Sequence, residues 1–404
     1  MDPSARNRLA ILAVRTVNWG SRVTRRGSGT VAGGRIGLQL SPKLLSALAR
    51  GRTTIVVSGT NGKTTTTAMV AAGWGGDVTT NATGANMPAG HVAALVESSY
   101  ANAALEVDEA WLPEVVREVG PAVVVLLNLS RDQLDRANEV RQMAERWRRC
   151  LSTESGFRGT VVANANDPLV VYAAMGATNV RWCDIPTRWM ADAKSCPRCT
   201  LAVHYQVSTW SCTCGFAKPT TLSTTLHDGL TVNEVDVPLE LSIPGAFNEA
   251  NAALAITALD EVGVSPLDAV QRINAVRAVA GRFTLRQWNG HTLHLLLAKN
   301  PSGFDALLST VEDDDADVWV AINARIADGR DPSWLYDVPF EKLRGHRVWC
   351  LGDRRLDLAT RLDYGGVAFE VVNDVDRIPA SPEPVALLAN YTAFSEWLAR
   401  STPC

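Results

Sequence analysis

Thr54-Ile-Val-Val-Ser-Gly-Thr-Asn-Gly-Lys-Thr-Thr-Thr-Thr67 is the stretch that decides the fold of this chain. An apolar β-branched run, Ile55 to Val57, leads into a turn that contains Gly59 and Gly62, and a helix-compatible run follows. A strand, a glycine turn and a helix in this order form a phosphate-binding loop. The glycines let backbone N–H groups approach phosphate oxygens, and the helix N-terminus favours an anion. The stretch therefore predicts a site for a nucleoside triphosphate.

The residues of this turn provide contacts for phosphate and a ligand for a metal ion. Lys63 can reach the β- and γ-phosphates, and the Thr64 hydroxyl can ligate Mg²⁺. The full pattern G-x-x-x-x-G-K-[ST] is not met, because Val57 stands where its first glycine belongs, so a glycine turn that merely precedes a lysine is the alternative. We expect ATP to contact Gly59, Thr60, Asn61, Gly62, Lys63, Thr64 and Thr65.

The composition is that of a globular protein with more than one domain. A length of 404 residues predicts two or three domains, and 46% hydrophobic with 20% charged residues is ordinary for such a chain. The formal net charge of −3 supplies no general attraction to nucleic acid. No run of about 18 apolar residues is present, which excludes a transmembrane helix. Eight cysteines in this length suit a reducing, cytoplasmic location better than a disulfide scaffold.

The N-terminal stretch from Arg6 to Trp19 predicts a helix that stays on the protein. Its apolar part is too short for a signal peptide, and no small-residue cleavage site follows. We favour packing of this helix on its own domain with solvated arginines. The alternative is a helix on an anionic membrane surface, which would place the chain at the inner face of the plasma membrane. The arginines that raise this alternative are Arg6, Arg8, Arg15, Arg22, Arg25 and Arg26.

Strands and helices alternate along the first half of the chain, which predicts a parallel, doubly wound sheet. Residues 30–45, rich in glycine, predict a connection into a short helix from residue 44 to 49. The polar, glycine-rich residues 78–90 predict a long loop that forms a wall of the site, or else an ordinary surface loop. The buried strand 123–127 runs into residues 128–135, at the strand end where open α/β sheets bind ligands.

Acidic residues follow the strand that ends at Glu106. Carboxylates at this end of the sheet would lie where Mg²⁺ and the triphosphate are held, so Glu106 is the best metal candidate. Asp108 and Glu109 are further candidates, although a helix-start role that favours the helix dipole is the better interpretation of Glu109.

Four cysteines interrupt the alternation with metal-ligand spacing. Cys196 and Cys199 form a C-x-x-C pair, Cys212 and Cys214 form a tighter C-x-C pair, and twelve residues lie between the two pairs. Two such knuckles predict one structural, tetrahedral Zn²⁺. Disulfides are the alternative, and His204 could replace one thiolate.

Polar residues of the second half give further candidates for nucleotide binding. Asn248, at a helix start, could meet an adenine edge or cap the helix, and Arg282 could clamp a phosphate or pair with an acid. A new α/β unit begins near residue 285, where Lys299 and Asn300 precede a helix and form a second anion site. A later loop carries Asp328, Asp331 and Asp337 at the end of a predicted strand from 318 to 323.

These motifs, taken in order, resemble the Mur ligase family, whose members form amide bonds through an acyl-phosphate. The resemblance covers nearly the whole chain from about residue 40 onward. The segments that carry it are Gly59 to Thr64, Glu106, residues 128–135, the helix start with Gly245, Asn248 and Asn251, Gly281 with Arg282, and Lys299 to Pro301.

Within that family the chain resembles the MurT-type synthetase subunits of lipid II isoglutaminyl synthase. The inserted cysteine ribbon, Gln133 in place of a metal-side histidine, and the lack of a separate UDP-binding domain point to this branch. The C-x-C knuckle, one residue short, departs from the usual spacing. The resemblance implies a heterodimer with a GatD-type glutamine amidotransferase whose catalytic dyad an aspartate of this chain completes. We assign Asp331 to that role, with Asp328 and Asp337 as alternatives.

The expected architecture is an N-terminal helical lead over residues 1–45, an ATP-binding domain over 46–284 with the zinc ribbon inserted at 190–220, and a smaller α/β domain over 285–404. The implied activity is ATP- and Mg²⁺-dependent amidation of the D-glutamate α-carboxylate of lipid II, with Lys63, Glu106 and Asp331 as catalytic residues. The alternatives are a ligase that adds an amino acid, as folylpolyglutamate synthases do, and a nucleotide-binding zinc-ribbon module that binds nucleic acid.

Overall fold

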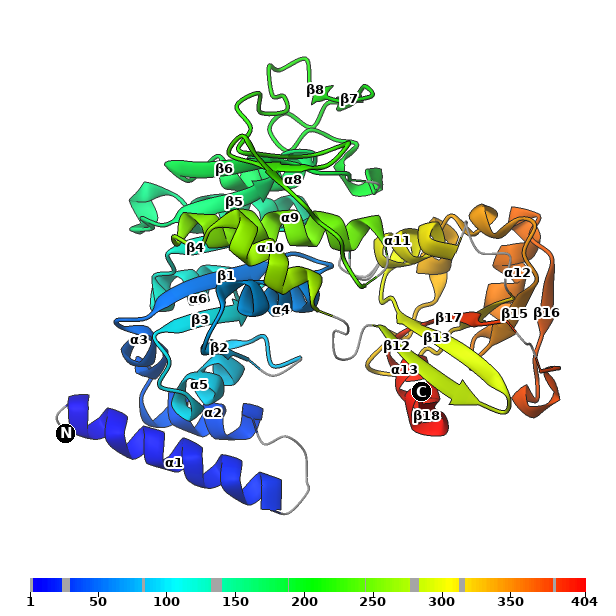
Figure 1. Cartoon of the computed structure of the whole chain (residues 1–404), viewed down its shortest axis with the longest axis horizontal. Helices are drawn as coiled ribbons and strands as arrows, with labels where there is room; N and C mark the ends of the chain where they lie inside the picture. Colours follow the sequence, from blue (N-terminus) through cyan, green and yellow to red (C-terminus); the bar gives the residue numbers. More distant parts are fainter. Residues whose placement is uncertain are drawn as a thin grey trace. The chain divides into compact units, whose positions relative to one another are not determined.

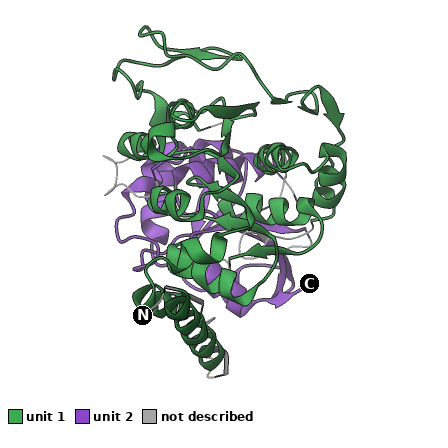
Figure 2. Cartoon of the chain, turned by 90° about the vertical axis from the view of Figure 1, so that its left-hand side faces the viewer, with its two compact units in different colours: residues 1–129, 139–242, 246–277 green, residues 130–138, 243–245, 278–404 purple. Residues whose placement is uncertain are grey.

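The computed structural model describes residues 3–23, 30–81, 84–131, 140–187, 189–243, 245–276, 283–311, 317–380 and 383–404. The chain divides into two compact units (Figure 2). Unit 1 consists of residues 1–129, 139–242 and 246–277, and unit 2 consists of residues 130–138, 243–245 and 278–404.

Unit 1 is built on a nine-stranded sheet in the order β11-β10-β9-β6-β5-β4-β1-β3-β2. Neighbouring strands run parallel throughout the part of the sheet that consists of β9, β6, β5, β4, β1, β3 and β2. At the other edge, β10 and β11 are antiparallel. The register pairs Val57 of β1 with Glu106 of β3 and Val125 of β4, which brings the polar ends of these strands to one edge. The strands are β1 (Thr53–Ser58), β2 (Val78–Thr80), β3 (Asn102–Glu106), β4 (Val123–Leu126), β5 (Thr160–Asn164), β6 (Asn179–Asp184), β9 (Thr224–Leu226), β10 (Leu230–Val232) and β11 (Val235–Val237).

Helices cover both faces of this sheet (Figure 1). On one face α4, α9 and α10 pack on one another, and on the other a continuous apolar core joins α3, α5, α6, α7 and α8 to the strands. Val56 points into that second core, whereas its neighbours Ile55 and Val57 lie outside it, as the two-residue repeat of a strand requires. The helices are α3 (Leu44–Ala49), α4 (Lys63–Trp74), α5 (Pro88–Glu97), α6 (Leu112–Val119), α7 (Val140–Cys150), α8 (Pro168–Ala174), α9 (Ala246–Glu261) and α10 (Pro266–Asn274), with short 3₁₀ turns at η2 (Thr153–Ser155) and η3 (Ala191–Ala193).

Two N-terminal helices, α1 (Pro3–Val23) and α2 (Thr30–Leu40), form a hairpin on the outside of unit 1 (Figure 1). The expectation of a connection over residues 30–45 is therefore wrong. Glycine is required here by close packing: a Cβ at Gly33 would lie 2.1 Å from Asn18 Oδ1 of α1, and one at Gly34 would lie 1.7 Å from the Ala89 carbonyl oxygen of α5. The expected long loop over residues 78–90 is likewise shorter, because β2 and α5 occupy its two ends.

The cysteine-containing insertion forms a small ribbon with the strands β7 (His204–Tyr205) and β8 (Trp210–Ser211). Its own apolar cluster joins Trp210 and Phe216 to Val171 of α8. The Trp210 indole N–H donates to the carbonyl of Ala165 at 3.1 Å, so the ribbon is attached to the body of unit 1.

Unit 2 contains a seven-stranded sheet in the order β16-β15-β14-β17-β13-β12-β18. The strands from β16 to β13 run parallel, and β12 and β18 add antiparallel edges. Its core includes Trp319 and Trp397, packed around Trp288. The elements are β12 (Phe283–Trp288), β13 (His291–Leu297), α11 (Pro301–Val311), β14 (Val318–Ala321), η4 (Ser333–Asp337), η5 (Phe340–Leu343), β15 (Val348–Leu351), α12 (Arg355–Gly365), β16 (Phe369–Val371), η6 (Val375–Arg377), β17 (Val385–Ala389), α13 (Tyr391–Arg400) and β18 (Thr402–Pro403).

The doubly wound α/β architecture predicted from the sequence is confirmed in both units. Among the described residues, no helix combines the length and the apolar character needed to cross a membrane.

Candidate active site

The glycine turn lies between β1 and α4, as the sequence predicts. Gly59 and Gly62 have φ angles of 150° and 87°, which L side chains rarely adopt. Space also requires glycine at both positions, because a Cβ at Gly59 would lie 2.8 Å from the Leu127 side chain and one at Gly62 would lie 2.6 Å from Asn251 Oδ1. A substituent at either position would close the cradle that a phosphate needs.

Asn128, at the end of β4, holds the turn in place. Its carbonyl accepts from Thr60 N at 3.0 Å and its side-chain oxygen accepts from Asn61 N at 2.9 Å, while its amide donates to the Asn61 carbonyl at 3.0 Å. The sequence placed residues 128–135 at this edge but gave Asn128 no role. The turn is thus preorganised by a neighbouring strand before any ligand arrives.

Thr64 and Glu106 lie together at the end of β3. The Thr64 hydroxyl donates to Glu106 Oε2 at 2.8 Å, and Asn86 Nδ2 donates to Glu106 Oε1 at 3.3 Å. A hydroxyl and a carboxylate oxygen this close form the hard-oxygen donor pair that Mg²⁺ prefers, so these residues fit the ion that the sequence predicts for them.

The backbone of Glu106 is fixed from two sides. Asn81 accepts from Glu106 N at 2.8 Å and donates to the Glu106 carbonyl at 3.1 Å, and His91 Nε2 bonds the same carbonyl at 2.8 Å. Burial lowers the pKa of His91 to about 4, so the ring stays neutral near pH 7. Asn81, Asn86 and His91 were not singled out from the sequence, and the only signal for them was the predicted site wall at residues 78–90.

Lys63 is buried and pairs with Glu109. Its ammonium lies 3.0 Å from Glu109 Oε2, and it also donates to the carbonyls of Gly59 and Thr60. Burial raises the pKa of Glu109, although Lys63 favours its ionised form. Glu109 lies three residues before α6 begins at Leu112, so the interpretation as a helix-start acid is wrong. The pair holds the lysine folded back over the turn, and phosphate oxygens would compete with Glu109 for it.

Helix α9 carries two buried amides, and one of them lies at the same turn. Asn248 and Asn251 are 7% exposed each, and Asn251 lies against Gly62. Two residues that the sequence linked to this site, Gln133 and Arg282, lie outside the described residues.

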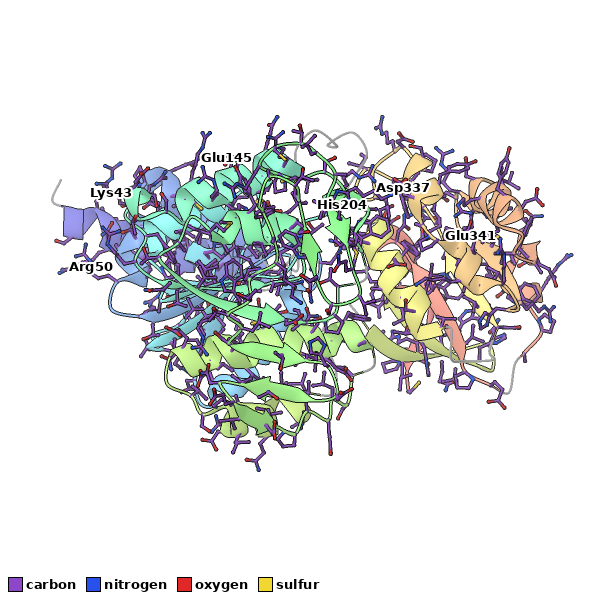
Figure 3. The ribbon with its side chains drawn as sticks, turned by 90° about the horizontal axis from the view of Figure 1, so that it is seen from above. Lys43, Arg50, Glu145, His204, Asp337 and Glu341 are labelled. Atoms are coloured by element: carbon purple, nitrogen blue, oxygen red, sulfur yellow. The ribbon has the colours of Figure 1, made fainter. Side chains whose placement is uncertain are left out.

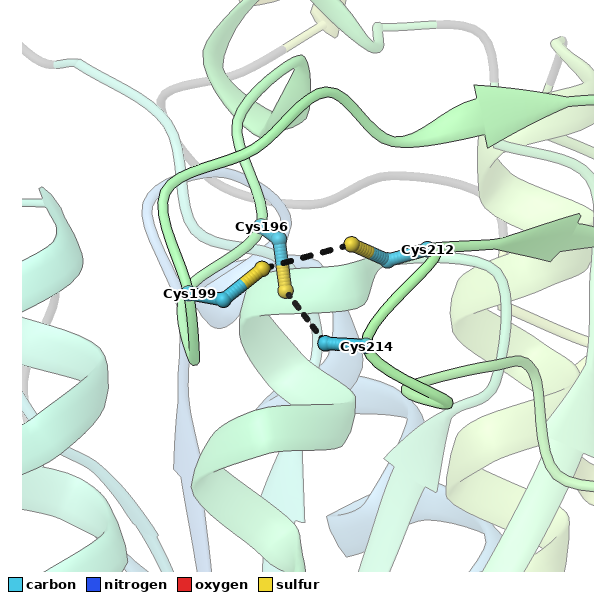
Figure 4. Close-up of side chains that lie close together, drawn as sticks. All are labelled: Cys196, Cys199, Cys212 and Cys214. Atoms are coloured by element: carbon cyan, nitrogen blue, oxygen red, sulfur yellow. Dashed lines mark hydrogen bonds between the residues drawn. The ribbon is translucent and has the colours of Figure 1, made fainter.

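The four cysteines predicted to bind zinc form one cluster (Figure 4). Their sulfur atoms all lie within 4.8 Å of one another, with 3.7 Å between Cys196 and Cys214 and 3.4 Å between Cys199 and Cys212. Zinc–sulfur bonds of about 2.3 Å in a tetrahedron give sulfur–sulfur edges of about 3.8 Å, so the cluster fits the ion. All four cysteines are free thiols, which contradicts the disulfide alternative, and His204 lies outside the cluster.

In unit 2, Lys299 and Asn300 precede α11. Asn300 is 1% exposed, and its side-chain oxygen accepts from Gly303 N at 2.9 Å, so it caps this helix. The Lys299 ammonium lies 5.1 Å from the centre of the Tyr391 ring. The structure therefore gives Asn300 a structural contact, and both residues stay predictions as ligands of a nucleotide.

The three aspartates of the loop after β14 have different surroundings. Asp328 is buried and accepts from Thr392 N at 2.9 Å, and Asp337 lies 3.5 Å from Arg131. Asp331 is exposed and forms no ion pair within the described part of the chain. The N–H of Ser333 donates to it at 2.9 Å and holds the pKa of its carboxyl below the usual range. Asp331 is thus an ionised acceptor that faces solvent.

Family comparisons agree with this geometry. The Mur ligase middle domain family matches residues 57–259, and the MurT ligase C-terminal family matches residues 297–394. The MurT subunit of lipid II isoglutaminyl synthase (glutamine-hydrolyzing) from Staphylococcus aureus strain COL is 29% identical, over 92% of each chain. The subunit of the same name from Streptococcus pneumoniae strain R6 is 26% identical, over 93% of each chain.

Solved structures share the fold at low identity. A pseudomurein peptide ligase type C from Methanothermus fervidus superposes with a TM-score of 0.65 at 16% identity, covering 86% of this chain and 78% of that one. MurF ligase from Thermotoga maritima in complex with ADP gives a TM-score of 0.60 at 13% identity, covering 90% and 83%.

The chain therefore belongs to the Mur ligase family, a class of ATP-dependent ligases. The separate match over its C-terminal unit, together with relatives aligned along nearly the whole chain, makes it a Mur ligase of the MurT type.

Proposed function

We propose that this chain is the synthetase subunit of a lipid II isoglutaminyl synthase, which amidates the D-glutamate α-carboxylate of lipid II during peptidoglycan biosynthesis. The observation that carries the proposal is the phosphate turn with Lys63, Thr64 and Glu106, found in a chain whose second unit matches the MurT ligase C-terminal family. The Staphylococcus aureus and Streptococcus pneumoniae relatives described above are named as subunits of lipid II isoglutaminyl synthase.

The proposed reaction uses ATP to activate a carboxylate. A carboxylate oxygen of the acceptor attacks the γ-phosphorus, the bond to the β–γ bridging oxygen breaks, and ADP leaves. Ammonia then attacks the acyl carbon, the C–O bond to phosphate breaks, and the amide forms with loss of a proton to solvent. Activation is needed because a free carboxylate is anionic and has no good leaving group for an amine to displace.

Residues of unit 1 have separate roles in this reaction. The turn from Gly59 to Gly62 presents backbone N–H groups to the phosphates, and Lys63 stabilises the charge that develops during transfer. Thr64 and Glu106 would hold Mg²⁺, which when bound neutralises phosphate charge and orients the oxygens. Asn81 and His91 keep Glu106 in place through its backbone.

The ammonia source is proposed to be a glutamine amidotransferase of the GatD type, bound to unit 2. Exposed apolar side chains support a docking surface beside Asp331: Ile326 and Tyr336 are 85% and 56% exposed, and Tyr364 contacts Tyr336 with ring centres 6.4 Å apart. Interfaces are enriched in tyrosine, and the exposed carboxylate of Asp331 could accept a hydrogen bond from a ring N–H of a partner's histidine. The alternative of an amino-acid-adding ligase would need no such partner.

Isotope transfer tests the proposed reaction. With ¹⁸O in the acceptor carboxylate, the purified chain, ATP, Mg²⁺ and free ammonia should release phosphate that carries one ¹⁸O atom. The variants Lys63→Ala and Glu106→Gln should release none, whereas the matched substitution Glu118→Gln on the surface of α6 should keep turnover. Amide formation without ¹⁸O in the phosphate would overturn the proposal.

A further inference from the structure

The hairpin of α1 and α2 carries an unusual charge. Between Pro3 and Gly76 the sequence contains no aspartate or glutamate, although the whole chain has a formal net charge of −3. The cations of α1 and α2 that the structure describes as exposed are Arg6, Arg8, Arg15 and Arg35. Arg8, Arg15 and Arg35 form no ion pair with a carboxylate among the described residues. The basic charge of the hairpin is therefore left unneutralised at the surface.

The α1 helix has one face fixed on unit 1. Ala10 and Val14 are fully buried, and Asn18 donates to Glu97 of α5 at 3.0 Å. Arg15, exposed at the edge of this face, reaches the Val96 carbonyl with the tip of its side chain at 3.4 Å. The helix is thus held against the domain, and its opposite face is free.

That free face is apolar along one stripe. Leu9, Leu12 and Trp19 are 52%, 62% and 67% exposed, and their spacing places them on one side of a helix. Arg8 and Arg15 stand four residues before Leu12 and Trp19, so the arginines form a second stripe directly beside the first. Isolated exposed leucines are common on surfaces, but an aligned apolar stripe bordered by arginines is typical of helices that lie in a membrane interface.

We propose that the α1–α2 hairpin docks this chain on an anionic lipid bilayer, with Leu9, Leu12 and Trp19 inserted among the headgroups. Charge complementarity selects this occupant over a second copy of the chain, because a self-association through the same face would bring arginine against arginine. Two further exposed basic residues, Lys43 and Arg50, flank α3 at the same end of unit 1 as α1 (Figure 3).

The hairpin is also connected to the active site within unit 1. α2 packs on the start of α5 at Gly34 and Ala89, and α5 follows the loop whose Asn86 contacts Glu106. Docking would therefore hold unit 1, which carries the phosphate turn, on the bilayer in which a lipid-linked acceptor is confined. This reason for docking rests on the proposed function, but the docking itself does not.

Sedimentation with vesicles tests the proposal, using the full chain without nucleotide or lipid-linked acceptor. We expect binding to vesicles of equal parts phosphatidylglycerol and phosphatidylcholine, weak binding to phosphatidylcholine alone, and loss of binding as salt is raised. An intact chain that stays in the supernatant with anionic vesicles at low salt would overturn the proposal. Because the assay needs no ligase activity, its failure leaves the proposed reaction standing, and failure of isotope transfer leaves the docking standing.

Paired variants separate docking from nonspecific attraction. Arg8→Glu with Arg15→Glu, and Leu12→Glu with Trp19→Ser, should each weaken binding to anionic vesicles by roughly tenfold or more. The charge-matched control is Arg117→Glu with Arg149→Glu, at side chains 69% and 76% exposed that line a cavity of about 480 Å³ elsewhere on unit 1. This control should bind as the unaltered chain does, and ADP release with free ammonia and a soluble acceptor should check folding of all variants.

Two outcomes would count against the hairpin. Equal loss of binding in the control would mean that any arginine cluster suffices, and binding that survives in both hairpin variants would mean that another surface is responsible. Light scattering tests whether the apolar stripe binds a second copy of the chain. A dimer that dissociates in the variant Leu12→Glu with Trp19→Ser would assign the stripe to self-association instead of a bilayer.

Discussion

At the scale of single residues, the candidate site depends on side chains that hold its proposed ligands in position. His91 lies fully buried behind Glu106 and bonds its carbonyl at 2.8 Å. Asn81 accepts a hydrogen bond from the N–H of Glu106, and Asn128 accepts one from the N–H of Asn61 in the glycine turn. These contacts remove motion from Glu106 and from the turn before a ligand binds, which lowers the cost of organising the site during the reaction.

The buried ring of His91 should make stability depend on pH. Its pKa of about 4 in the folded chain lies below the ordinary histidine value of 6.5, so the unfolded chain binds a proton as pH falls through 6.5 while the folded chain does not. The contribution of His91 to the free energy of unfolding is complete above pH 6.5 and should fall by about 3 kcal/mol on reaching pH 4. Denaturant titrations at several pH values, without Mg²⁺ or nucleotide, measure it.

The control for this dependence is His91→Gln, which can still donate to the Glu106 carbonyl but does not titrate. Its free energy of unfolding should fall less steeply between pH 6.5 and 4 than that of the unaltered chain, whatever its absolute stability. Parallel slopes for the two proteins would show that His91 takes up its proton in the folded state.

At the scale of elements, the ribbon between β6 and β9 is stabilised by few contacts of its own. Its two strands contain two residues each, and its apolar cluster includes Val171 of α8, which lies outside the ribbon. The turns that carry the thiols are closed by short backbone bonds, from Cys196 N to the Leu201 carbonyl and from Cys212 N to the Phe216 carbonyl, both 2.7 Å. A segment of this size generally needs a metal ion to hold its fold.

The ribbon should therefore hold one zinc ion per chain after purification without chelators. Cys196→Ser with Cys199→Ser should lose the zinc and lower the midpoint of thermal unfolding, because the thiols would no longer tie the two turns together. Cys404→Ser, at an exposed cysteine outside the cluster, is the matched control and should keep both. Elemental analysis that finds clearly less than one zinc in the unaltered chain contradicts the assignment.

At the scale of the whole molecule, the chain divides its chemistry between two units. Unit 1 carries the phosphate turn and the predicted metal ligands, and unit 2 carries an exposed loop with Asp331 and neighbouring apolar side chains. The proposed heterodimer places the release of ammonia from glutamine on a second protein bound to unit 2.

Asp331→Asn should separate the two half-reactions. In the complex with the amidotransferase, this variant should lose glutamine-driven amidation but keep most of its turnover with free ammonia, because the phosphate turn is untouched. Asp337→Asn, in the same loop but paired with Arg131, is the comparison variant and should retain both. Unchanged glutamine use in Asp331→Asn, with loss in Asp337→Asn, would transfer the role to Asp337. Rates measured with each nitrogen source decide between them.

The sequence by itself determined the elements whose signals are local. The strand, glycine turn and helix around Lys63 follow from residue types in order, and β4 at residues 123–126 and α3 at 44–49 appear where the sequence predicts a strand and a helix. Glu106 and the four cysteines were also found from the sequence, because the ligand chemistry of a carboxylate and of paired thiols is carried by the residue type and its spacing.

Only the tertiary structure decided what depends on distant neighbours. The glycines of residues 30–40 suggest a connection when read alone, yet they form a helix because Gly33 and Gly34 let two other helices approach. Lys63 contacts Glu109, which lies 46 positions later in the sequence, and Asn128 bonds Asn61 of the turn, which lies 67 positions earlier. Such contacts arise when parallel strands align their ends, and the energy that fixes them comes from burial and packing, which no short stretch of sequence contains.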